Sequence, residues 1–164
     1  MDARRRIYEV VSCFPGVHFR EIQRITRLGN GCLRYHLNVL ERCGAIESEK
    51  YGRRLRYYPR GMNSYQKKLL ALLHLDTARR ILVFLLNHSG ARHGDIARVL
   101  KLSPSTVSWH MRKLVECGVV CEIRGIYLLC DTEGLRKVLQ LYRRCLGGEG
   151  TGARAVRRGP AGEC

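Results

Sequence analysis

The chain has 164 residues, a hydrophobic fraction of 45% and a formal net charge of +16. This apolar content excludes a wholly disordered chain, and the length suits one ordinary domain or two small ones. Residues 1–62 carry 13 Lys and Arg against 6 Asp and Glu, and residues 63–146 carry 14 against 6. A positive field over both halves favours a polyanion, with nucleic acid ahead of an anionic membrane, although plain solubility would also account for it.

No secretory signal is recognisable, and the longest apolar run, Ile81–Leu86, is far shorter than the roughly 20 residues that a membrane span needs. We therefore expect a cytoplasmic protein, associated with the nucleoid, and no membrane partner. The chain contains eight cysteines. They would indicate a disulfide framework in a small secreted protein, a class that this chain does not match.

The first predicted unit consists of three helices and a hairpin. Apolar spacing predicts helices over Arg4–Phe14, His18–Thr26 and Gly31–Cys43, then a hairpin over residues 45–59, "AIESEKYGRRLRYYP". The turn before the third helix, "LGNG" at residues 28–31, lacks a Ser-Pro pair. We therefore expect this third helix to start loosely.

A connecting helix is predicted over residues 62–75. Apolar side chains lie along one stripe of it, at Tyr65, Leu69, Leu72 and Leu73. We expect this stripe to pack between the two units, so that they are not loosely tethered.

The second predicted unit repeats the order of the first, with helices over Asp76–His88 and His93–Leu100, a third helix ending at Cys117, and a hairpin over residues 119–130. Ser103 can cap the third helix, and Pro104 suits its first position because the missing N–H had no partner there. The hairpin, "VVCEIRGIYLLC", turns at Arg124 and Gly125.

A last helix is predicted over residues 132–146, with Thr132 as its cap. Its apolar stripe consists of Leu135, Val138, Leu139, Tyr142 and Leu146. This stripe is either the lid of the second unit's core or the face of a homodimer, and we lean slightly to the dimer. The Gly- and Arg-rich residues 147–164 are predicted to form a disordered tail.

The two units are copies of each other. Shifting the sequence by 74 residues aligns residues 5–50 with residues 79–124 without a gap, and 11 of the 46 positions are identical. The phrases "GCLRYHLNVLERCG" (residues 31–44) and "STVSWHMRKLVECG" (residues 105–118) correspond, each with an aromatic residue before a histidine. An internal duplication is the strongest organisational signal in the chain.

Three short helices followed by a hairpin predict a mainly α fold with small β-hairpin wings (α+β), arranged as a tandem winged helix-turn-helix. The predicted parts are a first domain at 1–61, the connecting helix at 62–75, a second domain at 76–131, the helix at 132–146 and the tail at 147–164. Residues 4–130 resemble the winged-helix regulators with arsenic-repressor-type domains, especially archaeal regulators with two such domains in tandem. "LSPSTVSWHMRKLVECGVV" is similar to the turn and recognition helix of that family, and "LGNGCLRYHLNVLERCGAI" matches with a degraded turn.

The third helices present two faces at 100° per residue. The stripes predicted to face the cores are Leu33, Leu37 and Leu40, and Val107, Met111 and Leu114. The candidates for reading bases lie on or beside the opposite face: Arg34, Tyr35 and Asn38, and Ser105, Thr106, Ser108, Trp109 and Arg112. Exposing an aromatic forgoes roughly 2 kcal/mol of burial, so Tyr35 and Trp109 are expected to contact a DNA groove or a protein partner. Packing against the other half of the chain is the alternative.

Phosphate contacts are predicted for basic residues of the wings and third helices: Arg53, Arg54, Arg56, Arg124 and Lys113. His36 and His110 lie at the margin of the apolar stripes. A boundary imidazole bonded to backbone is the favoured interpretation of both, and a phosphate contact is the functional one. Strand alternation places Arg54 and Arg56 on one face of the first hairpin, and Leu55 and Tyr57 on the other.

No metal site or cofactor is predicted. Cys117, Cys121 and Cys130 could approach one another across the second wing, but the chain has no Cys-x-x-Cys pair for a structural zinc site. Cys43 and Cys117 are interpreted as small packing residues at helix ends.

The sequence therefore predicts a sequence-specific regulator of transcription that binds double-stranded DNA and is not an enzyme, since no phosphate-binding Gly-rich loop or nucleophile–base arrangement is present. Two alternatives stay open. One is a tandem winged-helix scaffold for protein interactions, and the other is an architectural protein that binds DNA without choosing a sequence.

Overall fold

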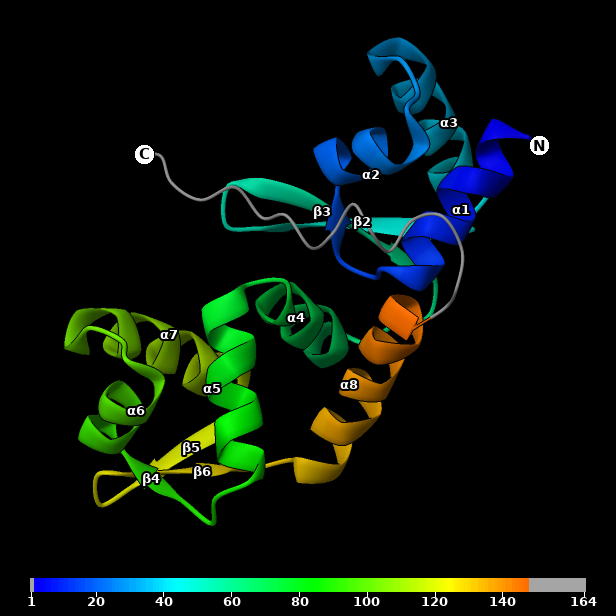
Figure 1. The fold of residues 1–164 in the computed structure, drawn as a ribbon. Coiled ribbons are helices and arrows are strands. Elements are labelled where there is room, and N and C mark those ends of the chain that lie inside the picture. Colours follow the sequence, from blue (N-terminus) through cyan, green and yellow to red (C-terminus); the bar gives the residue numbers. More distant parts are fainter. Residues whose placement is uncertain (1, 148–164) are drawn as a thin grey trace. The chain divides into compact units, whose positions relative to one another are not determined.

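A computed structural model describes the backbone of residues 2–147 and the side chains of residues 2–142. The chain divides into two compact units, the first formed by the residues up to Met62 and those from Leu139, and the second by Asn63–Val138. Each unit consists of helices and a small sheet (Figure 1). The tail predicted for residues 147–164 lies, from residue 148 on, outside the described residues.

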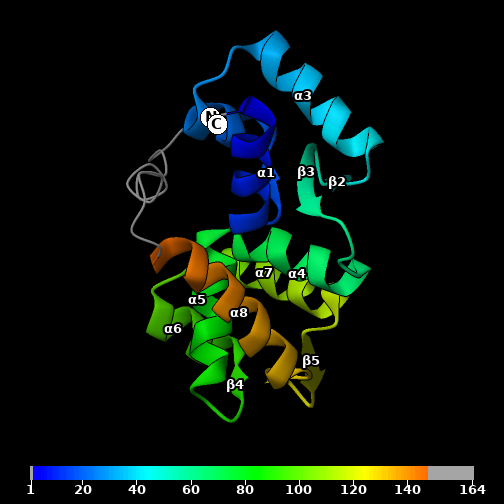
Figure 2. The same ribbon diagram turned by 90° about the vertical axis from the view of Figure 1, so that its right-hand side faces the viewer.

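The first unit has the predicted three helices and hairpin, plus one short strand that the sequence did not indicate. Its elements are α1 (Ala3–Cys13), β1 (Val17–His18), α2 (Phe19–Thr26), α3 (Asn30–Arg42), β2 (Ile46–Tyr51) and β3 (Arg54–Pro59). The antiparallel sheet has the strand order β1-β3-β2. Figure 2 shows the β2–β3 hairpin beside α1 and the end of α3, both of which it contacts.

Apolar side chains from all three helices and the sheet form the core of the first unit. Its buried members are Ile7, Val11, Phe14, Val17, Ile22, Leu33, Leu37, Leu40, Ile46 and Tyr57. The predicted stripe of α3 is thus confirmed. Burying a side chain of this size stabilises the fold by about 1.5–3 kcal/mol, so this core fixes which face of α3 is left for solvent.

The second unit repeats the arrangement. Its elements are α5 (Asp76–Leu86), β4 (Ala91–Arg92), α6 (His93–Leu100), α7 (Pro104–Cys117), β5 (Val120–Ile123) and β6 (Ile126–Leu129), and the strand order is β4-β6-β5. Ser103 caps α7 by accepting a hydrogen bond from the Thr106 amide at 3.2 Å, as predicted. Helix α3 begins after Gly29 without a side-chain cap from the described residues, which agrees with the looser start expected.

The duplication is visible in geometric details as well as in sequence. Helices α2 and α6 end on left-handed residues 74 positions apart, Arg27 (φ 57°) and Lys101 (φ 54°). The Arg6 guanidinium donates to the carbonyl of Thr26 at 2.7 Å. At the matching positions, Arg80 donates to the carbonyl of Leu100 at 2.8 Å. The first helix of each unit is therefore joined to the C-terminal end of that unit's second helix by an equivalent hydrogen bond.

One further helix belongs to the second unit, and another begins in that unit and crosses its boundary after Val138. Helix α4 (Ser64–Leu73) packs against α5 and α7, and Leu69–Leu73 are fully buried. Helix α8 (Thr132–Gly147) is capped by Asp131, whose carboxylate accepts from the Gly134 amide at 2.8 Å. The cap predicted at Thr132 was therefore wrong by one residue.

The first two residues of the apolar stripe predicted for α8 are buried within a single chain. Leu135 has no exposed surface, and Val138 has 3%. Both belong to the second unit, which favours the lid of that unit's core over the dimer face that we preferred from the sequence. Among the helices of residues 2–147, none combines the length and the hydropathy that crossing a membrane requires.

Candidate nucleic-acid interface

Helices α3 and α7 each turn one polar face to solvent, because their apolar stripes are buried in the cores. Residues exposed on these faces include every predicted base-reading residue except Thr106, which is half-buried: Arg34, Tyr35, Asn38, Ser105, Ser108, Trp109 and Arg112. The structure thus brings the predicted residues of each helix onto one surface, with a basic or aromatic group at its centre.

The aromatic residue on each face is held by the histidine that follows it. Tyr35 is 64% exposed and Trp109 is 50% exposed. The Tyr35 ring meets the His36 ring edge-on with centroids 5.2 Å apart, and Trp109 meets His110 in the same way at 4.7 Å. Side chains at adjacent helix positions normally diverge, so this contact in both copies fixes the direction in which each aromatic points.

The two histidines are positioned for packing more than for phosphate contact. His110 is only 9% exposed, and burial lowers its pKa, so the neutral imidazole is favoured. The phosphate contact predicted for His110 is therefore not supported. His36 is half-buried, and the Nδ1 atoms of both rings are buried without a hydrogen-bond partner among the described residues. The backbone bond expected of these rings is not made at Nδ1.

In each unit a further contact, here called the clamp, joins the first residue of the second helix to the third helix. In the first unit the Arg34 guanidinium lies over the Phe19 ring, 5.9 Å from its centroid. In the second unit His93 Nε2 lies 2.9 Å from Ser108 Oγ. The two pairs are 74 positions apart, and neither Phe19 nor His93 was among the site residues predicted from the sequence. Aligning the two copies could have found them, because the shift of 74 residues pairs Phe19 with His93 and also Arg34 with Ser108.

The hydroxyl groups at the start of α7 form a small network. Ser103 Oγ lies 2.7 Å from Thr106 Oγ1 and 3.1 Å from Ser105 Oγ. The cap thus engages two of the side chains predicted to read bases and fixes where their hydroxyls lie. Near the other end of α7, Lys113 forms an exposed ion pair with Glu116 at 3.4 Å, so its ammonium would exchange this partner for a phosphate.

The three arginines of the first wing that were predicted to contact phosphate lie in three different environments. Arg53 is exposed at the tip, next to Gly52 (φ 61°). Arg54 is exposed, and its Nη1 lies 2.6 Å from Nε2 of His18. Burial lowers the pKa of His18, which favours the neutral imidazole beside this guanidinium. Arg53 and Arg54 are thus accessible to a duplex.

Arg56 is a correction, because its side chain is only 6% exposed. Its Nη1 donates to the carbonyl of Gly16 at 2.6 Å, which ties β3 to the segment before β1. Leu55, predicted on the same face as Tyr57, is 44% exposed, whereas Tyr57 is 6% exposed. Arg56, Tyr57 and Tyr58 are buried in succession, so both faces of β3 are covered there, while Arg54 and Leu55 lie at its exposed end.

This difference predicts that two arginine substitutions change different properties, one the stability of the fold and the other the binding of DNA. Arg56→Ala is expected to lower the free energy of unfolding by about 2 kcal/mol, because it removes a buried charged hydrogen bond. Arg53→Ala is expected to leave that free energy within about 0.5 kcal/mol and to reduce the salt dependence of DNA binding by about one unit of slope. Urea unfolding and salt titration of both variants check this, and equal unfolding curves would contradict the assignment.

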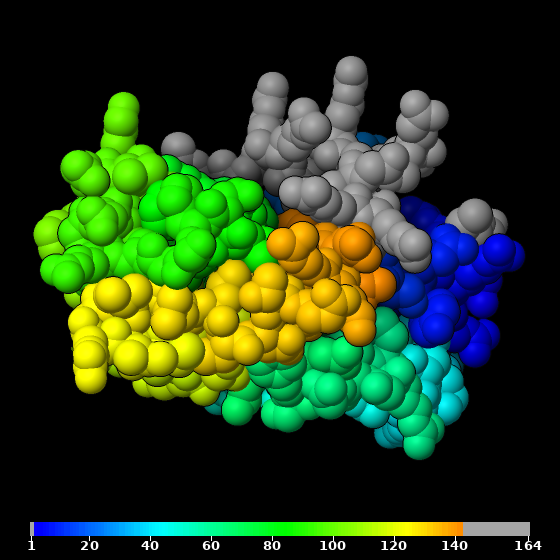
Figure 3. All heavy atoms as spheres, turned by 90° about the horizontal axis from the view of Figure 1, so that it is seen from below, coloured from blue at the N-terminus to red at the C-terminus, as the bar shows by residue number. Residues whose placement is uncertain are grey.

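The second wing is shorter and has one basic residue at its tip. Arg124 (φ 52°) and Gly125 (φ 77°) form the predicted two-residue turn, and both are exposed. Ile123 beside them is 55% exposed. The hairpin is yellow in Figure 3, where its atoms form part of the surface of the second unit. Arg124 therefore stays a candidate for phosphate contact.

The described His, Cys, Asp and Glu side chains do not assemble into a metal centre. Within residues 2–142, no group of three or more His, Cys, Asp or Glu side chains is placed to hold a metal ion.

Comparison with known proteins matches both halves of the chain. A family model described as an N-terminal HTH domain covers residues 1–70, and one described as winged helix-turn-helix DNA-binding covers residues 74–120. An uncharacterized HTH-type transcriptional regulator of Methanocaldococcus jannaschii is 37% identical over 119 residues. The matched region is 73% of this chain and 30% of that protein, so the chain spans under a third of its relative. Residues 1–70 and 74–120 thus match two helix-turn-helix domains in tandem, the second a winged helix-turn-helix, and the chain is similar to an archaeal transcriptional regulator.

Proposed function

We propose that this chain is a sequence-specific regulator of transcription that binds double-stranded DNA through α3 and α7. The observation that supports this most directly is the exposed aromatic on each polar helix face, held by a neighbouring histidine in both copies. A merely solvated face has no use for a large apolar ring. In the major groove such a ring can contact thymine methyl and sugar edges.

The polar neighbours of the aromatics would supply the directional bonds. In the first unit Arg34 suits guanine and Asn38 suits adenine, because each can form two hydrogen bonds to that base. In the second unit Arg112 would take guanine, and the hydroxyls of Ser105, Thr106 and Ser108 would bond to bases or phosphates. The clamps on Arg34 and Ser108 lower the entropy that these side chains lose on binding.

The wings and helix ends would supply phosphate contacts from Arg53, Arg54, Lys113 and Arg124. His36, which is half-buried, is a weaker candidate for the same role. These phosphate contacts would provide affinity without sequence preference, whereas base contacts from α3 and α7 would determine which DNA sequence is bound. We further propose that the protein acts in the cytoplasm on nucleoid DNA and has no enzymatic activity.

The two alternative functions fit the surface less well. A protein-interaction scaffold does not require exposed arginines on the hairpin tips of both units. An architectural DNA-binding protein requires them but has no need of clamped, base-directed side chains on the recognition helices. Each unit combines an exposed arginine at its hairpin tip with clamped side chains on its third helix, and this combination favours the regulator.

Selection from a pool of random duplexes tests the proposal. The full chain is incubated with the pool at about 150 mM salt, where nonspecific binding is weak, and the bound duplexes are sequenced over successive rounds. A regulator is expected to enrich one motif. Recovery of DNA without a motif would show an architectural protein, and no recovery would show that the chain does not bind duplex DNA.

A further inference from the structure

The turn between the second and third helices holds a left-handed basic residue in both units. Arg27 (φ 57°) ends α2, and Lys101 (φ 54°) ends α6. Glycine adopts this backbone conformation without strain, whereas the Cβ of any other residue crowds the following carbonyl oxygen. The chain uses glycine in this way at the end of α7, where Gly118 has a φ of 87°. The two equivalent turns therefore hold a charged residue where glycine would be relaxed.

The left-handed residues that carry a side chain share a positive charge. In the part of the chain that the structure describes they are Arg27, Lys101 and Arg124, and all three are exposed. Asn and Asp tolerate this conformation better than other side chains, yet neither stands at these positions. Arg124 is already a candidate for phosphate contact at the tip of the second wing. The common property is thus the charge, and not the ease with which the residue adopts a positive φ.

A second cation lies beside each turn. The Arg6 guanidinium donates, at 2.7 Å, to the carbonyl of the residue before Arg27, and Arg80 donates, at 2.8 Å, to the carbonyl before Lys101. One hydrogen bond leaves the other N–H groups of a guanidinium for a further acceptor. Within residues 2–142 none of these four basic side chains forms an ion pair. Neighbouring like charges without a carboxylate favour the binding of an anion beside them.

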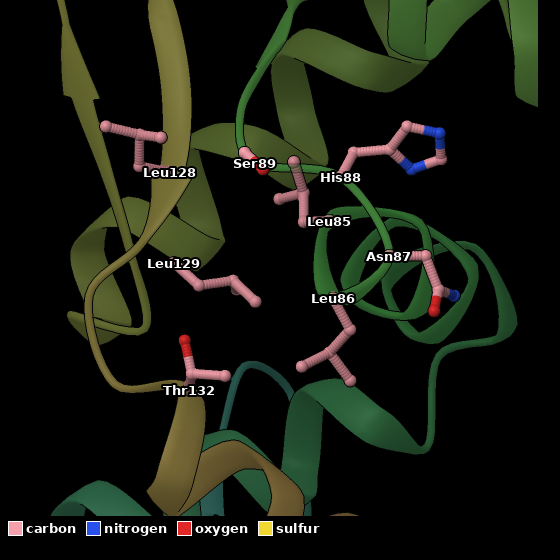
Figure 4. A pocket seen from close by; sticks show the side chains of 8 residues that line it. All are labelled: Leu85, Leu86, Asn87, His88, Ser89, Leu128, Leu129 and Thr132. Atoms are coloured by element: carbon pink, nitrogen blue, oxygen red, sulfur yellow. The ribbon is translucent and has the colours of Figure 1, made fainter.

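The pocket of the second unit offers an anion no comparable site. It has a volume of about 300 Å³ and lies at the C-terminal end of α5 (Figure 4). Its walls are mostly leucine side chains, including Leu128 and Leu129, and none of the residues that line it is a lysine or an arginine. The His88 ring points away from Leu129 and Thr132 (Figure 4). The turns, and not this pocket, are therefore suited to an anion.

We propose that each turn binds a backbone phosphate of duplex DNA, through Arg6 and Arg27 in the first unit and through Arg80 and Lys101 in the second. This inference rests on the proposed function and adds contacts outside α3, α7 and the wings. Each turn leads directly into a third helix, so a phosphate bound there fixes where that helix enters the groove. The strained backbone is tolerated at these positions because glycine would carry no charge.

Replacing the left-handed cations by glycine separates DNA binding from folding. Arg27→Gly and Lys101→Gly are each expected to weaken binding to a mixed-sequence duplex about tenfold at about 100 mM salt, and to make the slope of log affinity against log salt less steep by about 0.9. The urea midpoint of each variant should stay the same or rise, because the strain is relieved. A cation that serves only the carbonyl groups at the helix end would behave differently. Its removal would lower the midpoint and leave the slope unchanged, and that result would overturn the proposal.

Variants that keep the charge are the matched controls. Arg27→Lys and Lys101→Arg should keep both the slope and the midpoint of the unchanged chain. Arg6→Gln and Arg80→Gln retain a donor for the carbonyl but remove the charge, so they should make the slope less steep, as the glycine variants do. Slopes that stay unchanged in the glutamine variants would exclude Arg6 and Arg80 from the sites.

Fluorescence anisotropy on a mixed-sequence duplex and on the selected motif distinguishes this proposal from the proposed function. The expected result is an equal loss on both duplexes, since phosphate contacts carry no sequence information. If the unchanged chain prefers no motif while the glycine variants still make the slope less steep, the phosphate sites stand and the sequence-specific function fails. If a motif is preferred and the glycine variants keep the original slope, the phosphate sites are overturned and the function stands. A chain that binds no duplex overturns both.

Discussion

The affinity of the chain for duplex DNA is expected to fall about a thousandfold when the salt concentration rises from 50 to 200 mM. Each phosphate that a basic side chain neutralises releases condensed counterions, so log affinity falls with log salt at about 0.9 per contact. About six contacts give a slope near −5, and a fourfold rise in salt then costs about 10³ in affinity. Exposed basic residues on both units can supply them, including Arg53, Arg54 and Arg124.

Fluorescence anisotropy of a labelled duplex, measured at five or more salt concentrations, gives the slope. The matched control is Arg136→Ala, which removes an exposed arginine of α8 outside the proposed interface and should leave the slope unchanged. Arg53→Ala and Arg124→Ala should each reduce it by about one. A slope near zero, with binding still detectable, would contradict a phosphate-based interface and leave the scaffold as the better function.

The elements whose apolar spacing is regular were predicted correctly. Helices α3 and α7 were placed with the right stripes, because a helix of 13 or 14 residues with leucine or valine at three- and four-residue spacing has one way to bury them. Exposure of Tyr35 and Trp109 followed from the same geometry, since each lies opposite a stripe. The Arg124-Gly125 turn was also found, because Gly125 readily adopts a positive φ that a two-residue hairpin turn requires.

The features that the sequence did not reveal depend on contacts between distant segments. Strands β1 and β4 have two residues each, too few for any periodicity, and exist because they pair with β3 and β6. Arg56 was assigned to solvent by its charge, yet the carbonyl of Gly16, 40 residues away, accepts its hydrogen bond. The clamps from Phe19 and His93 are likewise tertiary contacts.

The double variant Trp109→Ala/Arg112→Ala is expected to lose about 100-fold or more in affinity for the selected DNA motif while nearly keeping its affinity for random DNA. A good base contact discriminates by about 1–3 kcal/mol, and two of them contribute roughly additively when they meet different bases. The corresponding change in the first unit, Tyr35→Ala/Asn38→Ala, should relax a different part of the motif. Competition binding with motif and scrambled duplexes measures both effects.

Stability should not account for this loss, because neither side chain belongs to the core. Trp109 is half-exposed and Arg112 is exposed, so truncation removes mainly the ring contact with His110, worth about 0.5–1.5 kcal/mol. Urea unfolding of the variant measures that difference directly. Equal weakening on motif and scrambled DNA would mean that α7 contributes contacts without choosing a sequence, and the architectural function would then replace the regulator. Unchanged binding to both would show that the exposed tryptophan faces a protein partner, because the duplex would not touch this face of α7.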